Sequence, residues 1–491
     1  MGRAPPRPTA RARRAARRAP PARVAAARAD FAGTRPPHRL AGRATERTMW
    51  KRAFAAAALT AACGVPSTPY RQSLAAFDDT PSAAVPVDDG EALFDGVGEL
   101  APDALARAAL ARNPSIEAAR QAWRAALARF DDATSFDDPR LVVSTAPLSF
   151  ASTDVQIGVS AEISQPLPWF GKRQLRGAVV AAEAEARRDD YEAVRQRLAL
   201  MATDLYYQLY LVDRALDINA DHIALLGADR AAITARLEAG RAWREDALKL
   251  DVDLAELRTA RASLEATRRV TVAQINALLH RRPDAPLPPP PAELPPPPPI
   301  DAAPESLVAR ALARRPELRA LAHERDAAAA SVALARRDDY PDVRVIAKYN
   351  RMWPMLEHQI MVGLAVDLPL QRARRAARVE VARARVARTD AERERFADSV
   401  REQVQTALAR AQEADDSAAL YRDRALPAAR GRVDAIRQGL DANRTEYVEV
   451  IRAERELRTV ALRYHEAIAA AYRWRAHLAW ALGDLAAGGQ P

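Results

Sequence analysis

The sequence repeats itself at an almost constant spacing, and this internal duplication restricts the chain to folds with two similar halves. Four landmarks in the first half recur 202 or 203 residues later in the second half. The matched segments are Leu110–Ile116 with Leu312–Leu318, Asp138–Val143 with Tyr340–Val345, Ile163–Leu167 with Val366–Leu370, and Ala239–Arg241 with Ala442–Arg444. Each half is therefore expected to fold as one copy of a unit of about 200 residues.

Each half begins with the same order of short elements. Helical periodicity predicts a helix at 103–131 and at 305–337, and two segments of period 2 follow each helix. The second segment alternates clearly, with apolar positions at Val155, Ile157, Val159, Ala161 and Ile163 in one half and at Ile360, Val362, Leu364 and Val366 in the other. About 10 alternating residues fit a tilted strand that crosses a membrane, apolar side outward. They also fit a half-buried strand of a soluble sheet, so the strands alone leave both interpretations open.

The helices that follow decide between these interpretations. Residues 171–238 contain no proline, and their apolar stripe predicts a helix about 100 Å long, which is too long for a compact domain. The stripe is Tyr191, Val194, Leu198, Met201, Leu205, Leu209, Val212 and Leu216. Residues 372–441 repeat this helix with a heptad seam, and Pro427 is expected to kink it. The seam is Val400, Val404, Ala407, Ala411, Ala414, Ala418 and Tyr421.

Each long helix is expected to turn back into a shorter return helix. The turns are placed near Gly240 and Asn443, because these residue types tolerate a left-handed backbone. The return helices are expected at 246–281 and 449–483, about half the length of the outgoing helices. The short helices at 103–131 and 305–337 are about as long as the difference between an outgoing and a return helix. A short helix stacked end to end on a return helix would therefore match the length of one outgoing helix.

A proline-rich connector separates the two halves. Residues 283–299 include 11 prolines in 17 positions, which excludes a helix or a central strand and favours polyproline structure. The predicted organisation is an Arg/Pro/Ala-rich extension at 1–48, a signal peptide at 49–62, a tether at 63–99, the first repeat at 100–282, the connector at 283–300, the second repeat at 301–485 and a tail at 486–491.

The predicted membrane strands require more than one chain. Four strands have two open edges, whose unpaired backbone groups lipid cannot satisfy. Barrels made by a single chain have at least about 8 strands. Two copies, at four strands each, would give 8 strands around an interior filled by side chains, whereas three copies would give 12 and a wider lumen. The fold class is thus mainly α with a small β-barrel portion shared between chains.

The charge and the cysteine content bound the function. Residues 1–48 hold 13 Arg against Asp30 and Glu46, so of the formal net charge of +10 this segment carries +11 and the rest −1. The remaining 443 residues lack the basic face of a nucleic-acid-binding protein.

Met49 opens a second start, where Lys51 and Arg52 precede a short apolar run that ends at Cys63, the one cysteine. This is the pattern of a lipoprotein signal, so we expect translation from Met49 and an acylated Cys63, with an ordinary secretory signal as the alternative.

The order of elements resembles the TolC family of outer-membrane efflux channels, over residues 100–485. The resemblance rests on the duplicated helix–strand–strand–hairpin unit, on Pro114 and Pro316, and on the segment Gln165–Arg173 after the second strand. The lipoprotein-like start resembles the heavy-metal and multidrug efflux members. Membership implies a homotrimer with a 12-stranded barrel continued by a helical tunnel, four strands coming from each chain. It also implies two protein partners, a periplasmic adaptor and an inner-membrane pump of the RND type or an ABC transporter.

The resemblance places the functional residues at the hairpin turns, which form the periplasmic mouth in this family. The family carries a carboxylate six residues after the turn glycine, and Asp246 and Glu449 lie at this distance from Gly240 and Asn443. Many members add a second acid three residues later, where this chain has Arg452 and, in the first hairpin, Lys249. The alternative is that Asp246 with Lys249 and Glu449 with Arg452 are surface ion pairs at i, i+3 spacing. Arg444 lies near a basic family position that ties neighbouring tips, shifted by one residue.

Other signals are weaker. Met352, Met355, His358 and Met361 would suit Cu(I), but a loop and strand role is favoured and no metal site or cofactor is predicted. The sequence offers no catalytic triad order, glycine-rich phosphate loop or metal-ligand spacing, so no enzymatic activity is expected. The alternatives to an efflux channel are a periplasmic coiled-coil adaptor or scaffold, and an outer-membrane channel for type I secretion. The cargo is left open between metal ions, drugs and polypeptides.

Overall fold

The computed structural model describes residues 67–81, 91–146, 158–239, 243–301, 303–351, 359–442 and 444–485. The predicted lipid-attachment residue Cys63 and the predicted turn residues Gly240 and Asn443 lie outside the described residues. The chain divides into Met1–Cys63 and Gly64–Pro491, and the fold described below is that of the second unit.

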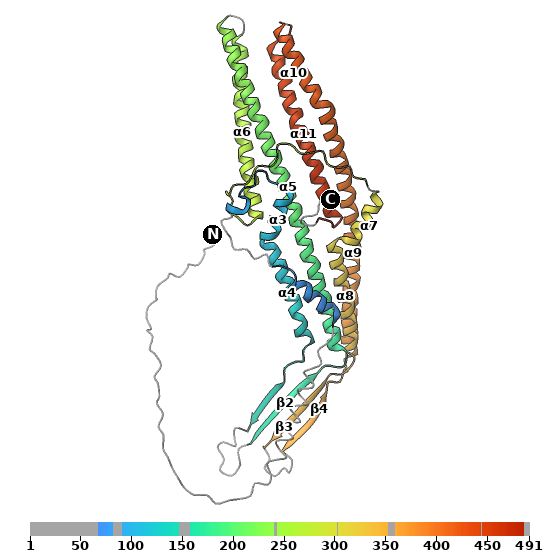
Figure 1. Cartoon of the computed structure of the whole chain (residues 1–491). Helices are drawn as coiled ribbons and strands as arrows, with labels where there is room; N and C mark the ends of the chain where they lie inside the picture. The colour runs from blue at the N-terminus through green and yellow to red at the C-terminus, as the bar shows by residue number, and fades with distance from the viewer. Residues whose placement is uncertain are drawn as a thin grey trace, which may run out of the picture. The chain divides into compact units, whose positions relative to one another are not determined.

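The described residues form the expected duplicated series of helices and strands (Figure 1). The first repeat comprises α3 (Pro102–Arg112), α4 (Pro114–Thr134), β1 (Arg140–Thr145), β2 (Val159–Leu167), α5 (Lys172–Glu238) and α6 (Arg244–Leu278). The second comprises α7 (Pro304–Arg314), α8 (Pro316–Arg337), β3 (Val343–Asn350), β4 (Ile360–Val366), α9 (Arg372–Leu420), α10 (Leu426–Asp441) and α11 (Tyr447–Ala481). Ahead of both repeats lie α2 (Thr68–Asp78) and a short 3₁₀ helix (Glu91–Phe94). The order and the two-copy architecture are confirmed.

The expected single helix at the start of each repeat is wrong, because each is broken in two. The breaks lie at Asn113–Pro114 and Arg315–Pro316, where proline takes the first position of the following helix. Proline forces the residue before it out of the helical region, and ψ at Asn113 and Arg315 is 124° and 121°. The second piece, α4 or α8, then leads directly into the strands.

The long helices are largely as predicted. The 67-residue α5 is uninterrupted, and the seam of the second long helix is buried from Val400 to Ala418. The stripe of α5 is wrong at Met201, which is 46% exposed, because at about 100° per residue this position lies about 80° from Tyr191, at the edge of the stripe. No helix among the described residues is both long and apolar enough to cross a membrane.

Proline interrupts the second long helix where it was expected to. A π turn at Tyr421–Ala425 separates α9 from α10, and the Leu426 N–H donates to the Tyr421 carbonyl, five residues back. Pro427 has no N–H to donate one turn back, so the ladder widens just ahead of it. The helix thus continues past the proline with a local bulge.

Within the second unit, α5 is flanked by helices of both repeats. It packs on α3, α4 and α6 on one side and on α8 and α11 on the other, while α9 packs on α7, α8 and α11. The short helices and the return helices therefore occupy successive stretches along the long ones, as the length argument predicted (Figure 1).

The four strands of the described residues form an antiparallel sheet in the order β1-β2-β3-β4 at one end of the helices (Figure 1). Its register places the alternating residues on two chemically different faces. Ser160 lies opposite Asn350 and Glu162 opposite Lys348, and the Glu162–Lys348 pair closes to 3.9 Å. The other face carries the exposed apolar side chains of Leu141, Val143, Ile163, Ile360, Val362, Leu364 and Val366. The predicted alternation is confirmed from Val159 onward, with one polar and one apolar face, while Val155 and Ile157 lie outside the described residues.

Both return helices end in the same left-handed motif, which fixes the chain where it leaves the helix. His280 has φ of 54° and its equivalent Gly483 has φ of 74°. In each case the next N–H reaches back five residues, from Arg281 to Asn276 and from Asp484 to Ala479, which is the bond of a Schellman motif.

The connector is extended, as predicted, and follows the first return helix without regular structure. Its carbonyls accept hydrogen bonds from the second repeat, at Pro295 from the Tyr472 hydroxyl (2.8 Å) and at Pro298 from Arg475 (2.6 Å). The connector thereby fastens the two repeats together.

Candidate functional site: the tips of the two helical hairpins

The two hairpins present equivalent helix starts at the end of the helices opposite the sheet (Figure 1). The return helix α6 begins at Arg244 and α11 begins at Tyr447, 203 residues later. Asp246 and Glu449 both lie in the first turn of their return helix. A carboxylate there is stabilised by the unpaired N–H groups and the positive end of the helix dipole.

The two acids have different partners despite their equivalent positions. A carboxylate oxygen of Asp246 accepts the backbone N–H of Trp243 at 3.3 Å, so it caps α6. Glu449 accepts a bond from Arg452, one turn later, at 2.5 Å. Glu449 with Arg452 is thus the surface ion pair considered as an alternative, whereas no described ion pair joins Asp246 to the exposed Lys249.

The exposed Arg444 contributes to the backbone of the second tip. Its N–H donates to the Gly439 carbonyl at 2.8 Å and closes the end of α10. Gly439 is required here, because a Cβ on it would lie 2.4 Å from the Thr445 hydroxyl oxygen. The described residues therefore bring all five predicted charged residues, Asp246, Lys249, Arg444, Glu449 and Arg452, to the hairpin tips.

Below the tips, the two hairpins contact each other through an apolar and charged seam that the sequence did not reveal. Leu226, Ile233, Leu250, Leu254 and Leu257 of the first hairpin cluster with Ile451 of the second. Beside this cluster Arg455 of α11 donates to the buried Asp253 of α6 at 2.8 Å. We call this contact the hairpin seam.

His222 of α5 lies buried within the hairpin seam, between two cavities of about 490 and 700 Å³ that it lines. Burial, together with the nearby Arg458 and Arg455, lowers the pKa of His222 to about 4, and Asp253 opposes this lowering. The histidine is therefore neutral at neutral pH. Both Arg residues come from α11, so its charge state is coupled to the contact between the hairpins.

A second ion pair holds the return helix against its own outgoing helix. Arg437 of α10 donates to Glu454 of α11 at 2.5 Å, and only 3% of the Glu454 side chain is exposed. Burial raises the pKa of the Glu454 carboxyl, and the bond from Arg437 opposes that rise. Both buried acids could have been noticed in the sequence, because each occupies a position where the helical pattern calls for an apolar residue. Asp253 lies three residues after Leu250, and Glu454 three residues after Ile451.

The comparisons with known proteins identify this architecture. Residues 307–484 match the family model described as outer membrane efflux protein. The matched residues lie in the second repeat of the chain. The TolC-type resemblance of the sequence is thereby confirmed, and no curated protein matches the chain.

Several solved structures have the same fold as this chain over most of its length. The outer-membrane channel OprN is 19% identical with a TM-score of 0.66, over 86% of this chain and 96% of that chain. CusC, whose structures report conformational changes that accompany folding and transmembrane channel formation, is 17% identical with a TM-score of 0.67. The match covers 82% of this chain and 98% of that chain. VceC, an outer membrane protein of Vibrio cholerae, is 16% identical with a TM-score of 0.66, over 78% and 96%.

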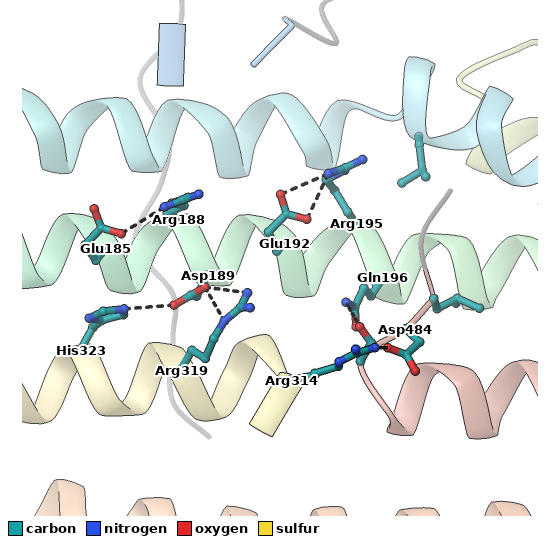
Figure 2. A pocket seen from close by; sticks show the side chains of 13 residues that line it. Glu185, Arg188, Asp189, Glu192, Arg195, Gln196, Arg314, Arg319, His323 and Asp484 are labelled. Atoms are coloured by element: carbon teal, nitrogen blue, oxygen red, sulfur yellow. Dashed lines mark hydrogen bonds and ion pairs between the residues drawn. The ribbon is translucent and has the colours of Figure 1, made fainter. Parts of the chain in front are cut away.

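Away from the tips, the described chain has a charged cavity of about 740 Å³ between its two repeats (Figure 2). Asp189 of α5 accepts bonds from Arg319 at 3.0 Å and lies 3.5 Å from the His323 ring, both on α8. Burial raises the pKa of Asp189, which these two partners oppose. Figure 2 also shows α5 acids paired with α5 arginines, Glu185 with Arg188 and Glu192 with Arg195. These last two pairs lie within α5, whereas the contacts of Asp189 with Arg319 and His323 join α5 to the second repeat.

No group of three or more His, Cys, Asp or Glu side chains is placed to hold a metal ion in the parts of the chain that the structure describes. Of the predicted methionine and histidine set, only Met361 falls within the described residues, on β4.

Proposed function

We propose that this chain is the outer-membrane channel of a tripartite efflux system. The observation that carries the proposal is a sheet with one apolar and one polar face, joined to helical hairpins within the fold of known outer-membrane channels. Strands with this alternation suit a barrel whose outer face meets lipid and whose inner face meets water. The channel is a passive conduit, and its cargo is a metal ion, a drug or another small solute.

The proposed assembly is a homotrimer that spans the outer membrane and extends into the periplasm. The edges of the sheet and the exposed sides of the outermost helices are then covered by other copies of the chain. A periplasmic adaptor would dock at the hairpin tips, and an inner-membrane pump of the RND type or an ABC transporter would supply energy. Cys63, acylated after cleavage of a signal at 49–62, would add a lipid anchor; two acyl chains hold a protein stably on a membrane.

We further propose that the hairpin tips form the narrow mouth of this channel. Asp246 and Glu449 supply two carboxylates from each chain, and a ring of carboxylates concentrates cations and repels anions. Arg452, which is paired with Glu449 here, and the nearby Lys249 reduce the negative potential of this ring. Arg444, in the loop of the second tip, would meet a neighbouring tip.

Single-channel recordings in planar bilayers test the proposal. Glu449→Gln should lower cation selectivity, and Arg452→Glu should raise it and strengthen block by multivalent cations. Arg410→Gln is the matched control, because the Arg410–Glu413 pair has the same i, i+3 spacing but lies on α9, far from the tips in sequence. Channels whose selectivity changes in none of the tip variants would place the constriction elsewhere. A purified oligomer without conductance would contradict the channel itself.

A further inference from the structure

The larger of the two cavities beside His222 has the features of a small-molecule site. Its volume is about 700 Å³, and ligand pockets in proteins typically measure about 300–1,000 Å³. Its lining residues come from α5 and α6 of the first repeat and from α11 of the second repeat. We call it the seam cavity, because it lies along the hairpin seam.

Much of the lining is apolar. Leu226, Leu257 and Ile451 belong to the apolar cluster of the hairpin seam, and Leu264 and Leu462 also line the cavity. A short hydrocarbon chain would be favoured here, because it covers apolar surface that otherwise meets water. The polar side chains of the cavity then determine which end groups a bound molecule can have.

Two buried side chains of the first repeat offer unused hydrogen-bond acceptors. Asn219 of α5 and Asp253 of α6 line the seam cavity and are only 5% and 8% exposed. Asn219 Nδ2 donates to the Leu257 carbonyl at 3.2 Å, and Asp253 Oδ1 accepts from Arg455 at 2.8 Å. The second oxygen of each side chain, Asn219 Oδ1 and Asp253 Oδ2, is buried without a hydrogen-bond partner among the described residues. Because an unpaired buried acceptor is costly, both atoms favour a ligand that donates hydrogen bonds.

Arg458 of the second repeat offers the opposite chemistry. Its half-buried guanidinium lines the seam cavity and has no ion pair in the described part of the chain. Burial lowers the pKa of Arg458, Arg455 adds to this lowering, and Asp253 opposes it. The other two arginines of the lining are paired, Arg455 with Asp253 at 2.8 Å and Arg463 with Glu466 at 3.9 Å. Arg458 is therefore the arginine of this cavity that lacks an anion.

We propose that the seam cavity binds a small zwitterion, with an ammonium and a carboxylate joined by a short hydrocarbon chain. The ammonium donates to Asn219 Oδ1 and Asp253 Oδ2, and the carboxylate accepts from Arg458. The hydrocarbon chain covers the apolar lining. Hydrogen bonds between a guanidinium and a carboxylate are stronger than those between neutral groups and can form in parallel pairs.

The charge balance of the cavity favours a zwitterion over an ion of either sign. Its lining holds three arginines and three carboxylates, and His222 is neutral at neutral pH. A simple cation would satisfy the acceptors but would add a positive charge beside Arg458. A simple anion would satisfy Arg458 but would meet the carboxylate of Asp253. A ligand that carries both charges avoids both repulsions, which are weakly screened in a partly buried site.

A bound zwitterion would bridge the two repeats. The acceptors lie on α5 and α6, whereas Arg458 lies on α11. A ligand that contacts both sides stabilises the hairpin seam by mass action, since it binds only when the two hairpins are packed together. This binding is separate from the passage of cargo, so it can be tested independently of the proposed channel.

Isothermal titration calorimetry of the solubilised full-length protein tests the proposal. The probes are γ-aminobutyrate, butyrate and butylamine, which share a carbon chain of equal length and differ only in their end groups. γ-Aminobutyrate should bind about tenfold more tightly than either single-charge probe, because each charge-assisted contact contributes at least this factor. Arg458→Gln should weaken its binding by about tenfold, to the level of butylamine.

Arg463→Gln is the matched control. Arg463 lines the same cavity but is already paired with Glu466, so its loss should leave the affinity for γ-aminobutyrate unchanged. Arg458→Lys keeps the positive charge and should retain most of the binding. Far-UV circular dichroism shows whether each variant is folded, and if Arg458→Gln does not fold, the comparison of the three probes on the wild type decides.

Tight binding of γ-aminobutyrate in the wild type and in Arg463→Gln, together with its loss in Arg458→Gln, would support the proposal. Equal affinities of the wild type for γ-aminobutyrate and butylamine would show that Arg458 binds no carboxylate, which overturns the zwitterion. Unchanged binding in a folded Arg458→Gln variant would place the ligand outside the seam cavity. Absence of binding by all three probes would assign the unpaired polar atoms to water and would also overturn the proposal.

Discussion

Acidification should loosen the hairpin seam through His222. The imidazole is buried and faces Arg455 and Arg458 of α11, with Asp253 of α6 as the nearest opposing charge. Protonation would add a third positive charge to this group. Because the folded-state pKa lies below the ordinary value of 6.5, the folded state binds fewer protons than the unfolded state in this range. The associated stability is present above pH 6.5 and is lost as the pH falls toward 4.

The size of the effect follows from the two pKa values. A shift from 6.5 to about 4 corresponds to at most about 3 kcal/mol per chain when the histidine is fully protonated. By pH about 5.5, the two-state linkage relation gives a loss of about 1.4 kcal/mol. Between neutral pH and pH about 6.5 the change is only a few tenths of a kcal/mol.

Thermal unfolding of the solubilised protein, followed by far-UV circular dichroism at several pH values, measures this loss. His222→Leu removes the titrating group while keeping an apolar side chain in the seam. The stability difference between the wild type and this variant should shift by about 1.2 kcal/mol in favour of the variant from neutral pH to pH about 5.5. Equal slopes in wild type and His222→Leu would refute the reasoning.

Three further predictions concern stability, each measured by the same unfolding assay. His280→Gly should stabilise the protein by about 1 kcal/mol, because glycine removes the cost of a left-handed residue. Gly483→Ala should destabilise it by at least about 1 kcal/mol, since a Cβ at Gly483 would also lie 3.0 Å from the backbone of α7. Unchanged stability in both variants would contradict this account. Arg315→Met should cost about 3–5 kcal/mol, since it removes a fully buried guanidinium that pairs with a carboxylate, whereas the exposed Arg410→Met should change stability by less than about 1 kcal/mol. Lys172→Met should lower the melting temperature, because it removes a buried ammonium at the junction between sheet and helices. An unchanged melting temperature would show that this ammonium contributes nothing to the stability of the fold.

Much of the fold follows from the sequence because periodicity and duplication are local or repeated signals. The alternation around Ile163 and Val362, the seam from Val400 to Ala418 and an interruption of the helix near Pro427 were all predictable from residue types and spacing, although the π turn was not. The breaks at Pro114 and Pro316 were missed, because a proline at the first position of a helix and a proline inside one look the same in a sequence.

The sequence predicted the positions of the candidate site residues along the hairpins, but not the contacts between the two hairpins. The charged residues of the tips came from the family resemblance combined with their distance to the expected turn residues, and Asp246 and Glu449 lie in the first turns of the return helices. The hairpin seam was not found, because Asp253 and Arg455 lie 202 residues apart and belong to different repeats. Whether Asp253 meets an arginine depends on how the two hairpins pack, which no local pattern encodes.

Duplication preserves backbone positions more faithfully than side-chain chemistry, and this determines how the two halves of the site can be compared. Asn113 and Arg315 occupy equivalent breaks, and both donate to the last carbonyls of a return helix, to Leu278 at 2.8 Å and to Trp480 at 3.3 Å. Arg315 also forms an ion pair with Glu317, whereas Asn113 is neutral. The two breaks therefore carry different charges in the same backbone geometry. At the tips, Asp246 caps its helix and Glu449 pairs with an arginine. Neutralising Asp246 would therefore disturb the start of α6 together with the charge of the mouth, so Glu449 is the residue that isolates the electrostatic contribution.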